Sequence, residues 1–239
     1  MGTYTKIPES TFEELQLDAG VLLSSFDPSS PAIADNAIIT ATTGGVQIQV
    51  TPTYSDIGSD VDNCPENTKE LKHLDGWAVS LSTTALNMSP DFIKFSLGAA
   101  ESSGATYSAS SDTTVQSGKT YYTRSGTSPT YVYTAVSSPT GNPSTNSYYE
   151  LTSPGKITPR RNLSQSDFGN LWWVGDRADG GFVAAKLINA LSTGGLSLQT
   201  SKNSKGQTSL TITCHPSITA QDVVPIEFYS VNRKEEINQ

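Results

Sequence analysis

The sequence predicts a mainly β fold of the α+β class: a β-sandwich or β-barrel-like domain with one α-helix and a small inserted β module. Three observations support this prediction. Several segments alternate apolar and polar residues, which is the pattern of half-buried strands. Residues 89–97 carry the one convincing helix signal. Residues 101–150 change abruptly to a composition rich in Ser, Thr and Tyr, without Leu, Ile, Phe, Trp or Met.

The first segment, residues 1–40, is expected to be an N-terminal arm because Pro8, Pro28 and Pro31 interrupt it. It contains one apolar run, residues 20–26, which could be an edge strand or a peptide that docks on a neighbouring subunit. The candidate contact residues in this run are Val21, Leu22, Leu23 and Phe26.

The second segment, residues 41–100, is predicted to form the first part of the β domain. It begins with an alternating strand pattern, continues through a polar acidic loop at 55–67, and then enters a long strand-like stretch at 69–86. The apolar faces of the two strands are expected to enter the core. Their members are Val46, Ile48, Val50, Trp77, Val79 and Leu81.

The helix is predicted at residues 89–97. Ser89 can cap free backbone N–H groups, Pro90 suits the first helical position, and Asp91 suits the positive end of the helix dipole. Gly98 is a plausible stop. Apolar side chains crowd this short segment, so we expect it to be buried between layers, with Phe92 and Ile93 in the core.

The third segment, residues 101–153, is predicted to be an inserted surface module. Seven of the ten tyrosines of the chain lie in this part, including the pairs Tyr121–Tyr122 and Tyr148–Tyr149. A disordered linker rarely carries so many aromatic residues. We therefore expect a small β module with a tyrosine core.

The last segment, residues 154–239, is predicted to complete the β domain and to end in a C-terminal arm. Residues 171–174 are apolar on both faces, residues 182–191 form a second apolar run, and alternation returns near the end. These patterns predict a meander of at least three strands. The expected core residues here are Trp172, Phe182, Leu210 and Ile212.

Charge and cysteine content restrict the class of protein. The net charge of −8 argues against sequence-reading DNA binding, because acidic surfaces repel phosphates. Cys64 and Cys214 do not make a disulfide framework and fit folding in a reducing cytoplasm. The N-terminus lacks the apolar run of a signal peptide, and no stretch approaches the length of a membrane span. We expect a soluble protein with no membrane partner.

No residue pattern predicts catalysis, a cofactor or a metal. A serine hydrolase needs a histidine beside its nucleophile. The chain has two histidines, His73 and His215, but no G-x-S-x-G nucleophile motif. A zinc site would need Cys214 and His215 on one ion, but neighbouring strand residues point to opposite faces. The acidic loop does not match the calcium pattern either. We therefore expect a non-enzymatic protein.

Long stretches of the sequence resemble one family. The strings ATTGGVQIQVTPTYSDIGSDVDNCPENTKELKHLDGW, SPDFIKFSLGAA, LWWVGDRADGGFVAAKLINALSTGGLSLQT and SITAQDVVPIEFY are similar to the major tail tube proteins of long-tailed phages and prophages of Gram-positive bacteria. The likeness runs from about residue 11 to residue 229, apart from the insert.

The resemblance implies a tail-tube-type β-sandwich whose strands join an inner β-barrel shared between subunits. Six copies would form a ring, and rings would stack into the tail tube of a virion, built in the host cytoplasm. Its other partners would be the tape measure, terminator and distal tail proteins, while genomic DNA passes through the lumen without specific binding. The loop at 56–66 matches the family's inter-subunit loop, which makes Asp56, Asp60 and Asp62 candidate contacts. The acidic balance predicts a negatively charged lumen.

A carbohydrate-binding β-sandwich is the alternative, because exposed tyrosines stack well on sugars. Filaments of the purified protein would favour the tube, whereas monomers that bind glycans would favour the alternative.

Overall fold

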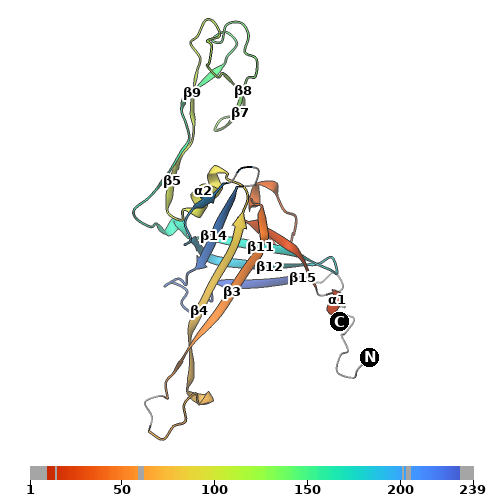
Figure 1. Cartoon of the computed structure of the whole chain (residues 1–239), viewed down its shortest axis with the longest axis vertical. Helices are drawn as coiled ribbons and strands as arrows, with labels where there is room; N and C mark the ends of the chain where they lie inside the picture. Colours follow the sequence, from red (N-terminus) through yellow and green to blue (C-terminus); the bar gives the residue numbers. More distant parts are fainter. Residues whose placement is uncertain (1–9, 14, 59–61, 201, 203–205, 232–239) are drawn as a thin grey trace. The chain divides into compact units, whose positions relative to one another are not determined.

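The computed structural model describes residues 10–13, 15–58, 62–200, 202 and 206–231. It divides the chain into two compact units (Figure 1). Unit 1 comprises residues 1–99 and 160–239, and unit 2 comprises residues 100–159. Strands dominate both units, so the mainly β class predicted from the sequence is confirmed.

Unit 1 is built on one antiparallel sheet with the strand order β2-β1-β11-β12-β14-β4-β3. The first half of β12 pairs with β15, and the end of β12 pairs with β14. The sheet therefore divides at β12 into two layers. In Figure 1, β11, β12 and β15 run across the direction of β3, β4 and β14. The strands are β1 (Gln16–Leu23), β2 (Ile38–Thr40), β3 (Thr42–Asp56), β4 (Lys72–Ala85), β11 (Gly169–Arg177), β12 (Phe182–Ser192), β13 (Ser197–Gln199), β14 (Gln207–Cys214) and β15 (Ile226–Val231).

Short helices connect these strands. The longest, α2 (Pro90–Ser96), follows β4. The others are α1 (Ser10–Glu13) and the 3-10 turns η1 (Asp35–Ala37), η2 (Lys69–Leu71) and η3 (Gln165–Asp167).

The main core lies between the two layers of unit 1. It unites apolar residues from β1, β4, β11, β12 and β14 with α2, and Val46, Ile48 and Val50 of β3 pack against it half-buried. Its buried members are Leu22, Val79, Leu81, Ala85, Phe92, Leu171, Leu187, Ala190, Leu210, Ile212 and Cys214. The alternation read from the sequence therefore places the same faces of β3, β4 and β14 inward.

A second core covers the other face of the β1–β11–β12 layer. Phe26 packs edge-on against Trp172, with ring centroids 5.6 Å apart, and against Phe182 at 5.4 Å. Leu171 faces the main core while Trp172 and Val174 face this one. The two-faced apolar run of residues 171–174 is thus covered on both sides by unit 1 itself.

The sequence left two interpretations of residues 20–26 open, an edge strand or a docking peptide, and in this structure Val21, Leu22 and Leu23 lie in a strand inside the sheet of unit 1. Residues 20–26 belong to β1 and its continuation, with Leu22 opposite Trp173 and Leu23 opposite Trp172. Leu22 is buried in the main core and Leu23 in the second core, while Val21 and Phe26 pack against the second. Consecutive apolar residues suit a strand with a core on each face, and the same run would also suit a docking peptide.

The helix α2 begins as its sequence signals predict. The Ser89 hydroxyl accepts a hydrogen bond from the Phe92 N–H at 3.1 Å, and such caps contribute about 1 kcal/mol. Gly98 follows the helix at φ +71°, and an added Cβ would lie 2.7 Å from the Ser192 carbonyl oxygen. Phe92 is fully buried, whereas Ile93 is only half-buried, because this single short helix presents one face to the core.

Unit 2 contains a two-stranded sheet of β5 (Ala100–Ser103) and β10 (Lys156–Pro159) and a four-stranded sheet of order β6-β9-β7-β8. The four strands are β6 (Thr106–Ala109), β7 (Tyr122–Thr127), β8 (Thr130–Ala135) and β9 (Tyr149–Ser153). Tyrosines pack on one another across this sheet. Tyr107 stacks on Tyr133 with centroids 4.0 Å apart and meets Tyr122 edge-on at 5.0 Å. The tyrosine side chains of this sheet therefore pack against one another, as expected for the inserted module.

A polar network supports the loop that precedes β7. The Tyr121 side chain is fully buried, and its hydroxyl donates a hydrogen bond to Asp112 at 2.6 Å. The Lys119 ammonium lies 2.7 Å from a carboxylate oxygen of Asp112 and 2.7 Å from one of Glu150. The Lys119 ammonium therefore forms ion pairs with two carboxylates, Asp112 and Glu150, that lie far apart in the sequence of the unit.

Candidate functional site

The distal part of the β3–β4 hairpin extends beyond the other strands of the unit 1 sheet. The two strands pair from Thr42 and Ala85 down to Asp56 and Lys72. β14 borders β4 only between Ser80 and Ala85. Beyond that point, residues 51–56 and 72–79 form a two-stranded ribbon, which projects from the sandwich in Figure 1.

The core-facing side of the hairpin continues onto this ribbon without a core to cover it. Val50 opposite Val79 is followed by Pro52 opposite Trp77 and then by Tyr54 opposite Leu74. The side chains of Tyr54, Leu74 and Trp77 are 54%, 41% and 36% exposed, and Ile57 at the tip is 63% exposed. We call these four residues the ribbon stripe. A contiguous exposed apolar patch of this kind marks an interaction surface.

Trp77 therefore lies outside the core in which the sequence placed it. Its position in the alternating pattern is right, since it shares a face with Val79 and Leu81. The prediction is wrong because the core covers this face of β4 only along part of the strand and not at Trp77. Tyr54 and Leu74 were not singled out, although Tyr54 extends the Val46–Val50 alternation in steps of two.

β3 itself is the last strand in the sheet order, and no described strand pairs with its outer edge. It is 15 residues long. Exposed edges of this length offer unpaired N–H and C=O groups to another chain. The ribbon stripe and the β3 edge together form a surface suited to a protein partner.

The loop at the tip of the ribbon is organised by Asp56. Its carboxylate accepts backbone N–H groups of Asn67 at 2.7 Å and of Gly58 at 3.0 Å. These two hydrogen bonds, with a smaller contribution from the Lys72 charge, lower the pKa of Asp56. Asp62 is exposed and makes no hydrogen bond among the described residues, and Asp60 lies outside them. Asp56 therefore shapes the loop, whereas Asp62 stays exposed at its surface.

Replacing Asp56 with asparagine should loosen the tip loop without affecting the sheet. Because the folded-state pKa is lowered, the carboxylate contributes fully above its ordinary value of about 3.9, and the contribution is lost as the pH falls through the folded value. In Asp56→Asn we expect faster amide hydrogen exchange at Gly58 and Asn67 at neutral pH. In the unmodified protein we expect the same acceleration only in strong acid, where Asp56 becomes protonated. Asp62→Asn is the matched control, and equal exchange in the two variants would contradict this role.

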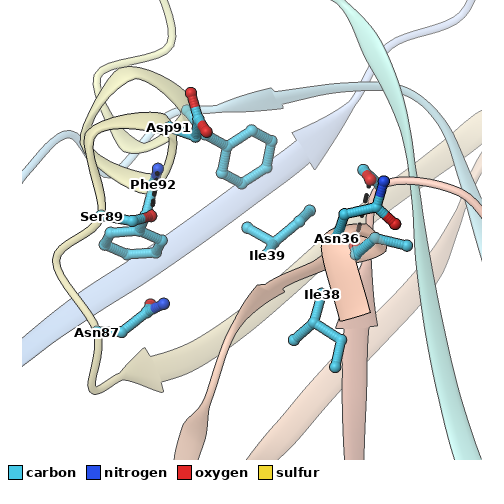
Figure 2. Close-up of a pocket in the computed structure, with 10 residues that line it drawn as sticks. Asn36, Ile38, Ile39, Asn87, Ser89, Asp91 and Phe92 are labelled. Carbon is cyan, nitrogen blue, oxygen red and sulfur yellow. Dashed lines mark hydrogen bonds between the residues drawn. The ribbon is translucent and has the colours of Figure 1, made fainter. Parts of the chain in front are cut away.

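A pocket of about 590 Å³ lies between β2 and α2. Figure 2 shows Ile39 between the β2 ribbon and α2, with Asn87 and Ser89 on the helix side. Asp91 is the one carboxylate among its lining residues, and the Ser89 hydroxyl already caps α2. The lining thus holds no pairing of a nucleophile with a base.

The residues that suggested metal chemistry are not brought together. Within the described ranges, no group of three His, Cys, Asp or Glu side chains could hold a metal ion. His215 instead packs edge-on against Phe168, with centroids 5.5 Å apart. None of the described helices is long and apolar enough to cross a membrane.

Comparisons with known proteins return no assignment: no protein-family model matches the chain, and no curated protein matches it significantly. Two observations bear on function: the geometry of the ribbon and the likeness of the sequence strings.

Proposed function

We propose that this chain is a structural subunit that assembles with copies of itself into stacked rings, forming the tail tube of a long-tailed bacteriophage. The observation that supports this most directly is the projecting β3–β4 ribbon, with an apolar stripe on one face and an open strand edge. An isolated monomer gains nothing from either feature, whereas an assembly buries both.

The open β3 edge supports ring formation. The layer β3-β4-β14 ends in β3 on one side, and on its other side β14 pairs with the three-residue strand β13 and with the end of β12. Two different edges on one subunit allow a head-to-tail contact, and such contacts generate rings when the rotation closes. Closure would join the layers into one inner barrel and cover the open β3 edge. We propose six copies per ring, as the sequence resemblance implies.

The ribbon stripe supports stacking. Each exposed aromatic side chain offers a large area, and burial stabilises by about 25 cal/mol per Å² of apolar surface. Trp77 and Tyr54 from several subunits would act together in each ring-to-ring contact. The assembled tube belongs to the virion, where it would meet the tape measure, terminator and distal tail proteins at its ends and conduct genomic DNA.

The test is the double variant Trp77→Ser with Tyr54→Ser. Both side chains are exposed in the subunit, so the urea midpoint should change little. We expect a folded protein that no longer forms tubes visible by electron microscopy. The matched control is Ile218→Ser, an 84% exposed residue outside the ribbon stripe, which should still assemble. Normal tubes from the double variant would exclude the ribbon from the stacking contact.

The alternative, a carbohydrate-binding module, is favoured by one observation in unit 2. Tyr131 is 39% exposed, and the Arg124 guanidinium lies 4.4 Å from its ring centroid and 4.8 Å from that of Tyr149. Aromatic rings and a cation can bind sugars. Most of these ring faces, however, already contact one another or Arg124, which favours a structural role for them. Glycan binding by a protein that remains monomeric would support the alternative.

A further inference from the structure

One side of the four-stranded sheet in unit 2 carries most of the tyrosines of this unit and a single arginine. Gly126 of β7 lies opposite Tyr131 of β8, and Tyr122 of β7 lies opposite Tyr149 of β9. Opposed residues of neighbouring strands, and residues two apart on one strand, point to the same side of a sheet. Arg124 lies between Tyr122 and Gly126 on β7, so its side chain stands on the same side as these tyrosines. We call this side the tyrosine face.

The Arg124 guanidinium is held by aromatic rings rather than by acidic side chains. Its central carbon lies 4.4 Å from the ring centroid of Tyr131 and 4.8 Å from that of Tyr149. Both distances fall within the range of about 6 Å in which an aromatic ring attracts a cation. Among the described residues, the Arg124 side chain forms no hydrogen bond and no ion pair. Its N–H donors are therefore left for solvent or for a ligand.

Arg124 is accessible to an anion from solvent. The residue is exposed, Tyr131 is 39% exposed, and Gly126, the next residue on the tyrosine face toward the end of the hairpin, has no side chain. Unit 2 has three acidic and three basic residues and so carries no net charge, whereas the whole chain carries −8. Two of the three carboxylates of unit 2 pair with Lys119. Unit 2 therefore repels an anion less than unit 1 does.

These features favour an acidic group on a polysaccharide as the ligand. The planar guanidinium matches the paired oxygens of a carboxylate or a phosphate, and hydrogen bonds between such ions are stronger than those between neutral groups. The Tyr131 hydroxyl, which bonds no described residue, can bond a sugar hydroxyl beside the ion pair. Sugar stacking contributes less, since Arg124 already covers the rings of Tyr131 and Tyr149. A nucleic acid is disfavoured, because its backbone requires several cations in a row and the tyrosine face has one.

We propose that Arg124 is the centre of a binding site for an acidic polysaccharide, in which the guanidinium binds a carboxylate or phosphate group and the Tyr131 hydroxyl binds the neighbouring sugar. One exposed ion pair contributes little by itself. Here Tyr131 and Tyr149 hold the guanidinium in place before the ligand binds, which reduces the side-chain entropy lost on binding. A polysaccharide repeats its acidic groups, so several copies of the chain can bind one polymer together. The site does not depend on tube formation.

Binding of two acidic polymers to the purified full-length protein tests this site. The protein is immobilised, and biolayer interferometry measures the binding of polygalacturonate, which carries carboxylates, and of phosphorylated dextran. Unmodified dextran is the neutral comparison. Arg124→Gln removes the cation, and Arg124→Lys keeps the charge without the planar guanidinium. The matched control is Arg161→Gln, because Arg161 is an exposed arginine of unit 1 and its replacement changes the net charge equally.

We expect the unmodified protein to bind at least one acidic polymer and not dextran, and each polymer that binds identifies an anion that the site accepts. Binding should weaken roughly tenfold in Arg124→Gln and remain unchanged in Arg161→Gln. Arg124→Lys should also bind more weakly than the unmodified protein. Its near-ultraviolet circular dichroism should match that of the unmodified protein, which separates loss of the site from unfolding of unit 2.

Equal binding by Arg124→Gln and Arg161→Gln would overturn the site. So would failure to bind either acidic polymer, or equal binding of dextran. If Arg124→Gln loses the circular dichroism of the tyrosines, Arg124→Lys decides, and undiminished binding by that variant would overturn the site. Tube formation is measured separately by electron microscopy, so each of these results leaves the proposed function unaffected.

Discussion

Removal of residues 1–26 should unfold unit 1 and not merely prevent assembly. The deletion takes away β1, which lies between β2 and β11, together with buried Leu22 and Leu23 and the Phe26 ring that packs on Trp172. Loss of a buried side chain of this size costs about 2–5 kcal/mol. Three such losses match the roughly 5–15 kcal/mol that stabilises a whole domain. We expect the deleted protein to lack the cooperative unfolding transition of unit 1 in urea.

Deletion of residues 1–12 is the matched control, because it spares β1 and both cores. That variant should retain the transition of unit 1. A 1–26 deletion that still unfolds cooperatively, with the same dependence on urea, would show that β1 adds little to the cores and that residues 20–26 act as an arm after all.

Replacing Lys119 with methionine should destabilise unit 2 and leave unit 1 intact. The ammonium group bridges Asp112 and Glu150, and its removal leaves two neighbouring carboxylates without their shared cation. The hydrogen bonds that Lys119 donates to Asp112 and Glu150 raise the pKa of Lys119. The hydrogen bonds that Asp112 accepts, first from Lys119 and then from Tyr121, lower the pKa of Asp112. The lowered Asp112 pKa means that its contribution is present above about pH 3.9 and is lost as the pH falls through the folded value.

The measurement is the near-ultraviolet circular dichroism of the tyrosines, with hydrogen exchange to locate the change. Seven of the ten tyrosines belong to unit 2, so its unfolding should dominate the signal. Lys156→Met, at a residue of β10 whose ammonium forms no ion pair among the described residues, should leave the spectrum unchanged. Equal spectra for the two variants would show that the network is not required for the packing of unit 2.

The sequence predicts those parts of the fold where one local signal decides the outcome. Ser89 and Pro90 fix the start of α2 because capping depends only on neighbouring residues. Residues 171–174 read correctly as a strand buried on both faces, since polar residues are absent from either side. The tyrosine-rich insert was separable because its composition differs from that of its surroundings.

The misreadings share one physical cause. Alternation shows which residues lie on one face of a strand but not whether the same chain covers that face. Trp77 follows the pattern of Val79 and Leu81, and only the end of β14 beside Ser80 leaves it exposed. Leu22 and Leu23 are the opposite case. Strands β11 and β2 pair with their strand and cover it, and the residues next to Leu22 and Leu23 in the sequence do not reveal these partners. The candidate interface is therefore visible only once the strand ends are known.

Electron microscopy of the concentrated, purified protein in negative stain tests the central claim most directly. We expect hollow filaments of uniform width built from stacked rings, lost in the Trp77→Ser, Tyr54→Ser variant and kept in Ile218→Ser. A protein that remains a dispersed, folded monomer under every condition of salt and concentration tried would contradict it.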